Sequence, residues 1–238
     1  FVFGDVHGNI GYLTRGKLPV RSRANAWMPV PGWTGEHEWQ GFVPFDEMPR
    51  SRNPRSGYIV TANNKITSDD YGHYISLDYS PDFRARRIME RLKSMNRVTA
   101  SDMVSVHGEK TSIPAEVFSR LLSAVTPLDD ASVQAIAELL HWGGKMDKGA
   151  VAPAIYSAFR LELDRMLFNH LLGPIADETL GATGRGAPMQ LAQIRALWVE
   201  MAYQGDTSML PPGCDWRSIA ARALAESLAG LRNRLGDD

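Results

Sequence analysis

Two asparagines and one arginine in the first half of the chain have the chemistry to bind a developing negative charge. Asn63 and Asn64 follow the apolar run at residues 58–60, and Arg84 comes 21 residues after Asn63. A neutral Asn amide donates hydrogen bonds without titrating, and the Arg guanidinium donates through a fixed planar fork. An Asn pair after a strand is also typical of a turn, and Arg84 could be a solvated helix charge. The pattern indicates either an oxyanion-binding pair or a turn followed by a basic helix.

A second candidate site lies near the N-terminus. Residues 4–9 read GDVHGN and resemble the opening of the calcineurin-type metallophosphoesterases, in which a strand-end Asp and a His bind one ion of a two-metal site. Such a site needs a bridging Asp, an Asn and further His ligands. The later G-D-x-x-D and G-N-H-E/D motifs of that family do not occur in the sequence. We therefore expect Asp5 to cap a turn, His7 to lie exposed in a hairpin, and neither to bind a transition metal.

The elements that must position these residues begin with a strand-rich region. Short alternating runs predict strands at residues 1–3 and 10–13, joined by a tight turn, and a third strand at residues 58–61. Between the second and third strands, residues 17–56 are a loop punctuated by prolines. A loop of this length inside a compact domain is typical of a wall of a binding site.

From residue 81 the apolar period changes from two to 3.6, which predicts helices. Residues 80–82 read as a helix start, with a Ser cap and a Pro at the first helical position, and residues 99–102 read as a capping pattern. The residues predicted to share helix faces are Val133, Ile136 and Leu140; Ile155, Phe159, Met166 and His170; Leu191, Ile194, Trp198 and Met201; and Ile219, Ala223, Leu228, Leu231 and Leu235. The glycine-rich run at residues 181–186 is interpreted as a flexible connection.

Composition narrows the classes of protein without selecting one. The chain has 238 residues, enough for one large domain or two small ones. Its net charge of −1 gives no indication of a nucleic-acid or anionic-membrane partner. No apolar run approaches the roughly 20 residues of a membrane span, and Phe1 does not open a signal peptide. The single cysteine, Cys214, excludes an intramolecular disulfide and a C-x-x-C metal site.

Several ordered landmarks in the first 92 residues together resemble one enzyme family. Residues 41–64 read GFVPFDEMPRSRNPRSGYIVTANN, residues 5–12 read DVHGNIGY, residues 28–33 read MPVPGW, and residues 81–88 read PDFRARRI. In this order they resemble the β-subunit of penicillin acylase-type amidases, which are N-terminal-nucleophile hydrolases. The later part of the chain shows helices and no motif of that family.

The resemblance implies roles for the asparagines and the arginine. In this family the Asn that closes the first stretch supplies the oxyanion hole; its best match is Asn63, and Asn64 is the spare candidate. The best match to the active-site Arg is Arg84, which would hold Asn63 or the catalytic α-amine in place. We therefore expect Asn63 to end a strand and to lie within hydrogen-bond reach of Arg84, or one water away.

The resemblance also implies that the attacking group lies elsewhere. The family's nucleophile is the first residue of the β-subunit, a Ser, Thr or Cys whose own α-amine acts as the base. This chain begins with Phe1, which has no nucleophilic atom beyond its amine. We expect the chain to be inactive alone and to need the α-subunit and the remaining β-subunit of the same precursor as partners.

The expected fold is α+β, with a few antiparallel core strands of an N-terminal-nucleophile hydrolase sandwich at residues 1–80 and a mainly helical region at residues 81–238. By resemblance, the parent protein would hydrolyse nonpeptide amides, such as an acylated β-lactam nucleus or an N-acyl homoserine lactone, through an acyl-enzyme. Periplasmic or extracellular location, maturation from a zymogen and a role in antibiotic resistance are further implications. The alternative from another class is a noncatalytic helical module or pseudoenzyme.

A structural calcium ion is a further family feature. Several members bind Ca²⁺ through a backbone carbonyl that matches the region near Ala26 and through a carboxylate whose position here is held by His73, with Asp69 and Asp70 nearby. Calcium prefers oxygen ligands. We therefore predict no metal or other cofactor for this chain, and leave a structural calcium open for the parent protein.

Overall fold

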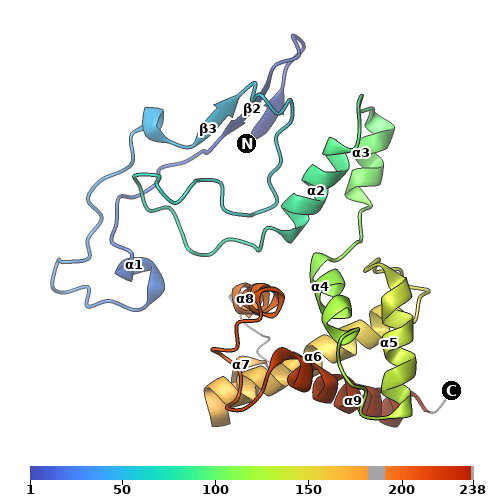
Figure 1. Ribbon diagram of the computed structural model, residues 1–238. Helices are drawn as coiled ribbons and strands as arrows, with labels where there is room; N and C mark the ends of the chain where they lie inside the picture. The colour runs from blue at the N-terminus through green and yellow to red at the C-terminus, as the bar shows by residue number, and fades with distance from the viewer. Residues whose placement is uncertain (182–190, 237–238) are drawn as a thin grey trace. The chain divides into compact units, whose positions relative to one another are not determined.

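The computed structural model describes residues 1–181 and 191–236, and the chain divides into two compact units, Phe1–Thr99 and Ala100–Asp238. The first unit holds the strands and the second is built from helices (Figure 1). The expected α+β class, antiparallel strands followed by a mainly helical region, is confirmed. The glycine-rich run at residues 181–186 lies, after Gly181, outside the described residues.

The first unit is organised around a small antiparallel sheet. Its strands are β1 (Val2–Gly4), β2 (Ile10–Leu13) and β3 (Arg50–Arg52), in the order β1-β2-β3. In the pairing of β1 with β2, Gly11 lies opposite Phe3. The hairpin predicted for the first two strands is therefore confirmed.

The turn of this hairpin is held by the side chain of Asp5. One carboxylate oxygen accepts hydrogen bonds from the backbone N–H groups of His7 and Asn9, both at 2.9 Å, and the other accepts from Asn9 Nδ2 at 2.7 Å. Asn53 joins the end of β3 to the turn, since it accepts from the N–H of Ile10 and donates to Asn9 Oδ1. The bonds from Asn9 lower the pKa of Asp5. Asp5 caps the turn and His7 is exposed, as expected.

The third strand lies elsewhere than predicted. Residues 58–61 form no strand, and β3 comes instead from the long loop at residues 17–56, which also contains α1 (Ala24–Trp27) and η1 (Phe45–Glu47). A strand requires a hydrogen-bonding neighbour, and Arg50–Arg52 occupies the free edge of β2. The β-branched residues of 58–61 have no ladder partner in the described ranges, so propensity alone does not make them a strand.

Helix α2 (Phe83–Lys93) follows this segment and belongs to the first unit. It begins later than predicted, because Asp82 is its N-cap residue and Pro81 precedes it. The N–H of Ser80 donates to the backbone carbonyl of Asn63 at 2.8 Å. This bond ties the chain before the helix to the asparagine loop.

The second unit contains the remaining helices. They are α3 (Ala100–His107), α4 (Ile113–Leu122), α5 (Asp130–Trp142), α6 (Ala152–Leu172), η2 (Gly173–Ile175), α7 (Ala176–Thr179), α8 (Leu191–Gln204) and α9 (Trp216–Leu235). The long helices α6 and α9 pack along each other (Figure 1). No helix of the described residues is long and apolar enough to cross a membrane.

Aromatic side chains fill the centre of this helical unit. Phe118 of α4 meets Phe159 of α6 edge-on with 5.7 Å between ring centroids, and Phe168 of α6 meets Trp198 of α8 at 4.7 Å. All four side chains are at most 1% exposed. Such pairs contribute about 0.5–1.5 kcal/mol beyond their buried area.

The sequence predicts where the helices lie better than it predicts which of their faces are buried. Trp198 and Phe159 are buried as predicted, but Val133 and Leu140 of α5 are 53% and 51% exposed, and Leu139 is buried in their place. Neighbouring stripes on one helix share the same 3.6-residue period. The period therefore predicts the helix without selecting which stripe the partner helices cover.

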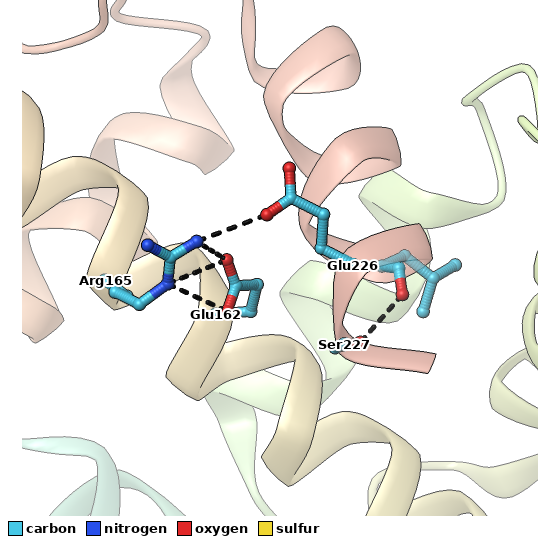
Figure 2. A network of polar contacts seen from close by, with 5 residues as sticks. Glu162, Arg165, Glu226 and Ser227 are labelled. Atoms are coloured by element: carbon cyan, nitrogen blue, oxygen red, sulfur yellow. Dashed lines mark hydrogen bonds and ion pairs between the residues drawn. The ribbon is translucent and has the colours of Figure 1, made fainter. Parts of the chain in front are cut away.

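A polar network joins the outer sides of α6 and α9. Arg165 donates to both oxygens of Glu162 on its own helix and to Glu226 of α9 at 3.2 Å, while Ser227 donates to a backbone carbonyl one turn earlier (Figure 2). Although burial opposes it, Arg165 lowers the pKa of Glu162; burial and the nearby Glu162 raise the pKa of Glu226. The network connects the two longest helices at their surface.

Candidate active site

Asn63 has an unusual backbone conformation. Its φ angle is +63°, and among the described residues the only other non-glycine with positive φ is Asn53. The left-handed region is disfavoured for most side chains but is visited by Asn. Because residues 58–61 form no strand, Asn63 does not end one, and that prediction is wrong. A loop turn positions the residue instead.

Arg84, in the first turn of α2, forms hydrogen bonds with this loop. A single nitrogen, Nη2, donates to the backbone carbonyl of Ala62 at 2.7 Å and to Asn63 Oδ1 at 3.0 Å. The hydrogen-bond contact expected between Asn63 and Arg84 is therefore present. A guanidinium can only donate hydrogen bonds, so the atom of the Asn63 amide that faces Arg84 must be its oxygen. The orientation of the amide is therefore fixed.

The two asparagines differ in what their amides can still bind. Asn64 accepts from the N–H of Ala62 at 3.0 Å and donates to the carbonyl of Lys65 at 2.9 Å. Asn63 uses its oxygen for Arg84, and within the described part of the chain its Nδ2 has no protein acceptor. The geometry thus favours Asn63 over Asn64 as a donor to an external group.

Both residues of the pair lie at the surface of this chain. Asn63 and Arg84 are exposed, whereas the neighbouring Ala62, whose carbonyl Arg84 also bonds, is buried. The amine of Phe1 donates to the carbonyl of Leu13 at 2.8 Å and so belongs to the sheet. The arrangement offers a neutral N–H donor, aligned by a cation, to any negatively charged oxygen placed beside it.

A pocket that the sequence did not reveal lies next to the asparagine loop. Its volume is about 310 Å³, and its lining includes Tyr12 and Ser51 of the sheet and Asn64, Lys65 and Ile66 of the loop. The sequence carries no signal for it, because the sheet and the loop are brought together only by folding. The substrate-binding residues, which the sequence left unknown, have their nearest candidates here.

Two residues at or near the expected calcium position, His73 and Asp69, are each paired with another side chain. His73 Nε2 lies 2.6 Å from Glu47 Oε2, the Tyr71 hydroxyl donates to the Glu47 carbonyl, and Asp69 bonds Lys65. In the described ranges no three or more His, Cys, Asp or Glu side chains are grouped so that they could hold a metal ion. Calcium takes six to eight oxygen ligands, and the imidazole of His73 offers it none.

Comparison with known proteins gives a consistent result. The penicillin amidase family profile matches residues 1–238. The chain is 34% identical to a penicillin acylase 2 proenzyme of Pseudomonas sp. (strain SE83), over 98% of this chain and 30% of that protein. It is 27% identical to the acyl-homoserine lactone acylase QuiP of Pseudomonas fluorescens (strain Pf-5), over all of this chain and 31% of that one.

A solved structure has the same fold. A thermostable penicillin G acylase from Alcaligenes faecalis superposes with a TM-score of 0.72 and 22% identity, covering all of this chain and 47% of the other. The chain spans about 30% of the length of the curated relatives it matches.

Proposed function

Because this chain belongs to the penicillin amidase family, we propose that it is the part of an amidohydrolase that supplies the oxyanion donor Asn63 and its holder Arg84. The observation that carries the proposal is the contact from Arg84 Nη2 to Asn63 Oδ1, which leaves Asn63 Nδ2 as a donor. A structural turn residue would not need a cation from another element to fix its side-chain oxygen.

The chemistry divides between this chain and the rest of the parent protein. An N-terminal Ser, Thr or Cys in another part of the precursor attacks the amide carbonyl, and its α-amine takes the proton. Negative charge then develops on the carbonyl oxygen, where Asn63 Nδ2 donates. Arg84 draws electron density from the Asn63 oxygen and polarises the amide, which strengthens its N–H donor. As the intermediate collapses, the protonated α-amine gives its proton to the leaving nitrogen, the C–N bond breaks, and the acyl-enzyme remains for water to hydrolyse.

The partners proposed are the α-subunit and the remaining β-subunit of the same precursor. An oxyanion donor is worth most in a site from which water is excluded, yet Asn63 and Arg84 are exposed here. Large apolar side chains of the same unit are exposed as well, among them Phe1 at 67% and Trp33 at 87%. The remaining chain would cover these side chains and close the site.

The proposed substrates are nonpeptide amides, either an acylated β-lactam nucleus or an N-acyl homoserine lactone. The names of the relatives, penicillin acylase and acyl-homoserine lactone acylase, support both classes. Maturation from a proenzyme, periplasmic or extracellular location and a contribution to antibiotic resistance belong to the same proposal.

The test is substitution of Asn63 in the full-length precursor. After maturation has been checked by the appearance of the two subunits, Asn63→Ala should lower kcat by about 10²–10³, because one oxyanion donor is lost. Asn96→Ala, at an exposed asparagine after α2, serves as the matched control. The assay uses penicillin G and an N-acyl homoserine lactone.

If mature Asn63→Ala enzyme kept a normal kcat, Asn63 would be a structural turn residue. A parent sequence without a Ser, Thr or Cys at a processing junction would favour the noncatalytic module or pseudoenzyme instead.

A further inference from the structure

The side-chain amide of Asn64 forms hydrogen bonds with backbone groups on both sides of Asn63. Its oxygen accepts from the N–H of Ala62, on one side of Asn63, and its nitrogen donates to the carbonyl of Lys65, on the other. The amide therefore bridges the loop across the residue that carries the free donor. Both of its ends are used within the chain, so Asn64 is a structural element of the loop.

Ala62 takes part both in the Asn64 bridge and in the contact with Arg84. Ala62 donates its N–H to Asn64 Oδ1 and accepts on its carbonyl a hydrogen bond from Arg84 Nη2, and it is 7% exposed. The next carbonyl, that of Asn63, accepts from the N–H of Ser80. Consecutive peptide groups are thus fixed from three directions.

These side-chain hydrogen bonds replace the backbone hydrogen bonds that a strand would make with its neighbour. Residues 58–64 form no regular element, so the loop backbone must be satisfied by side chains and turns. The left-handed conformation of Asn63 persists only when its surroundings enforce it. Without the Asn64 bridge, the Ala62 N–H would lose its partner, and the peptide group between residues 61 and 62, on the N-terminal side of Asn63, would no longer be fixed.

We propose that Asn64 is a positioning residue for the oxyanion donor: it holds Asn63 in the left-handed conformation from which Nδ2 points away from Arg84. This inference rests on the proposed function, since it assigns to Asn64 an effect that is transmitted only through Asn63. The two consecutive asparagines then have different roles, one to donate and one to shape the backbone.

The experiment is a double-mutant cycle in the matured full-length enzyme. Asn64→Ala should lower kcat about tenfold, less than the loss of the donor itself, while KM stays near the wild-type value. In the Asn63→Ala background the same substitution should have little further effect, because residues that act as a unit are not additive. If Asn64→Ala instead caused a general loss of structure, it would lower kcat by the same factor in the wild-type and Asn63→Ala backgrounds.

Two further variants complete the design. Asn64→Asp keeps the acceptor for the Ala62 N–H and loses the donor to Lys65, so its kcat should lie between those of Asn64→Ala and the wild type. Asn53→Ala is the matched control, because Asn53 also has positive φ and two side-chain bonds, but it follows β3 and its bonds go to the hairpin turn. Its kcat should stay near wild type when each kcat is normalised to titrated nucleophile.

The outcomes separate the two proposals. A normal kcat for Asn63→Ala overturns the proposed function. A lowered kcat for Asn63→Ala with a normal kcat for Asn64→Ala, or an equal loss in both backgrounds, overturns only the positioning role. If Asn64→Ala does not mature, Asn64→Asp decides: an intermediate kcat supports the role and a wild-type kcat overturns it.

Discussion

The two units of this chain are stabilised in different ways. The helical unit has a core of fully buried aromatic and aliphatic side chains, such as Phe118, Phe159 and Trp198, whereas Phe1 and Phe3 of the strand unit are 67% and 48% exposed. In the strand unit, Asp and Asn side chains hold loops and turns by accepting hydrogen bonds from backbone N–H groups. Apolar packing therefore stabilises the unit without a candidate site, and polar geometry shapes the unit that carries one.

This difference fits the proposal that the strand unit is completed by the rest of its precursor. Large apolar side chains such as those of Phe1 and Trp33 are exposed, and β1 and β3, which pair only with β2 in the described ranges, could accept further strands at their outer edges. A donor site on such a surface would become dry only on assembly. The comparison can be tested by substitutions that act on one unit and leave the other unchanged.

The largest effect is expected in the helical core. Phe159→Ala should lower the free energy of unfolding by about 3–5 kcal/mol, because it leaves a cavity among side chains that cannot collapse into it. Phe3→Ala in β1 is the matched control and should cost far less, since that ring is half exposed. Urea unfolding followed by circular dichroism measures both. Equal losses would show that the exposed ring of Phe3 is as important as the core.

A smaller effect is expected at the start of α9. Asp215 accepts from the N–H of Ser218 at 2.7 Å and forms a capping box with it, so Asp215→Ala should cost about 1 kcal/mol in the free energy of unfolding. The bond from the Ser218 N–H lowers the pKa of Asp215 below its ordinary value of 3.8. Its contribution is therefore present above about pH 4 and is lost as the pH falls through the lowered value.

Asp215→Asn separates the cap from its charge. Asn caps a helix as well as Asp does but does not titrate, so this variant should keep its stability at neutral pH and lose part of the acid-dependent decrease. Thermal unfolding at a series of pH values below 5 measures this. An unchanged acid profile in Asp215→Asn would contradict the assignment.

The smallest effect is expected in the hairpin of the strand unit. Asp5→Ala removes the acceptor for three N–H groups of the turn, so amide hydrogen exchange should become faster in β2 and stay unchanged in α6. Asp5→Asn keeps one acceptor oxygen and should be intermediate. If β2 exchanged at the wild-type rate in Asp5→Ala, the hairpin would be held by its strand pairing alone.

Four features could be predicted from the order of the amino acids alone: the family, the hairpin, the existence of the later helices and the contact between Asn63 and Arg84. Each of these depends on local patterns or on an ordered set of motifs: a turn flanked by alternating residues, a 3.6-residue period, and the landmarks around residues 41–64. Such signals are contained in neighbouring residues and can be read without knowing what packs against them.

Long-range contacts set which segment became the third strand, which stripe of α5 was buried, and which of the two asparagines kept a free donor. β3 formed at Arg50–Arg52 because that segment reached the free edge of β2, and Leu139 replaced Leu140 because the partner helices cover that side. Asn63 and Asn64 are alike in sequence. They differ because Arg84, 21 residues away, takes the oxygen of one, while the loop backbone takes both ends of the other.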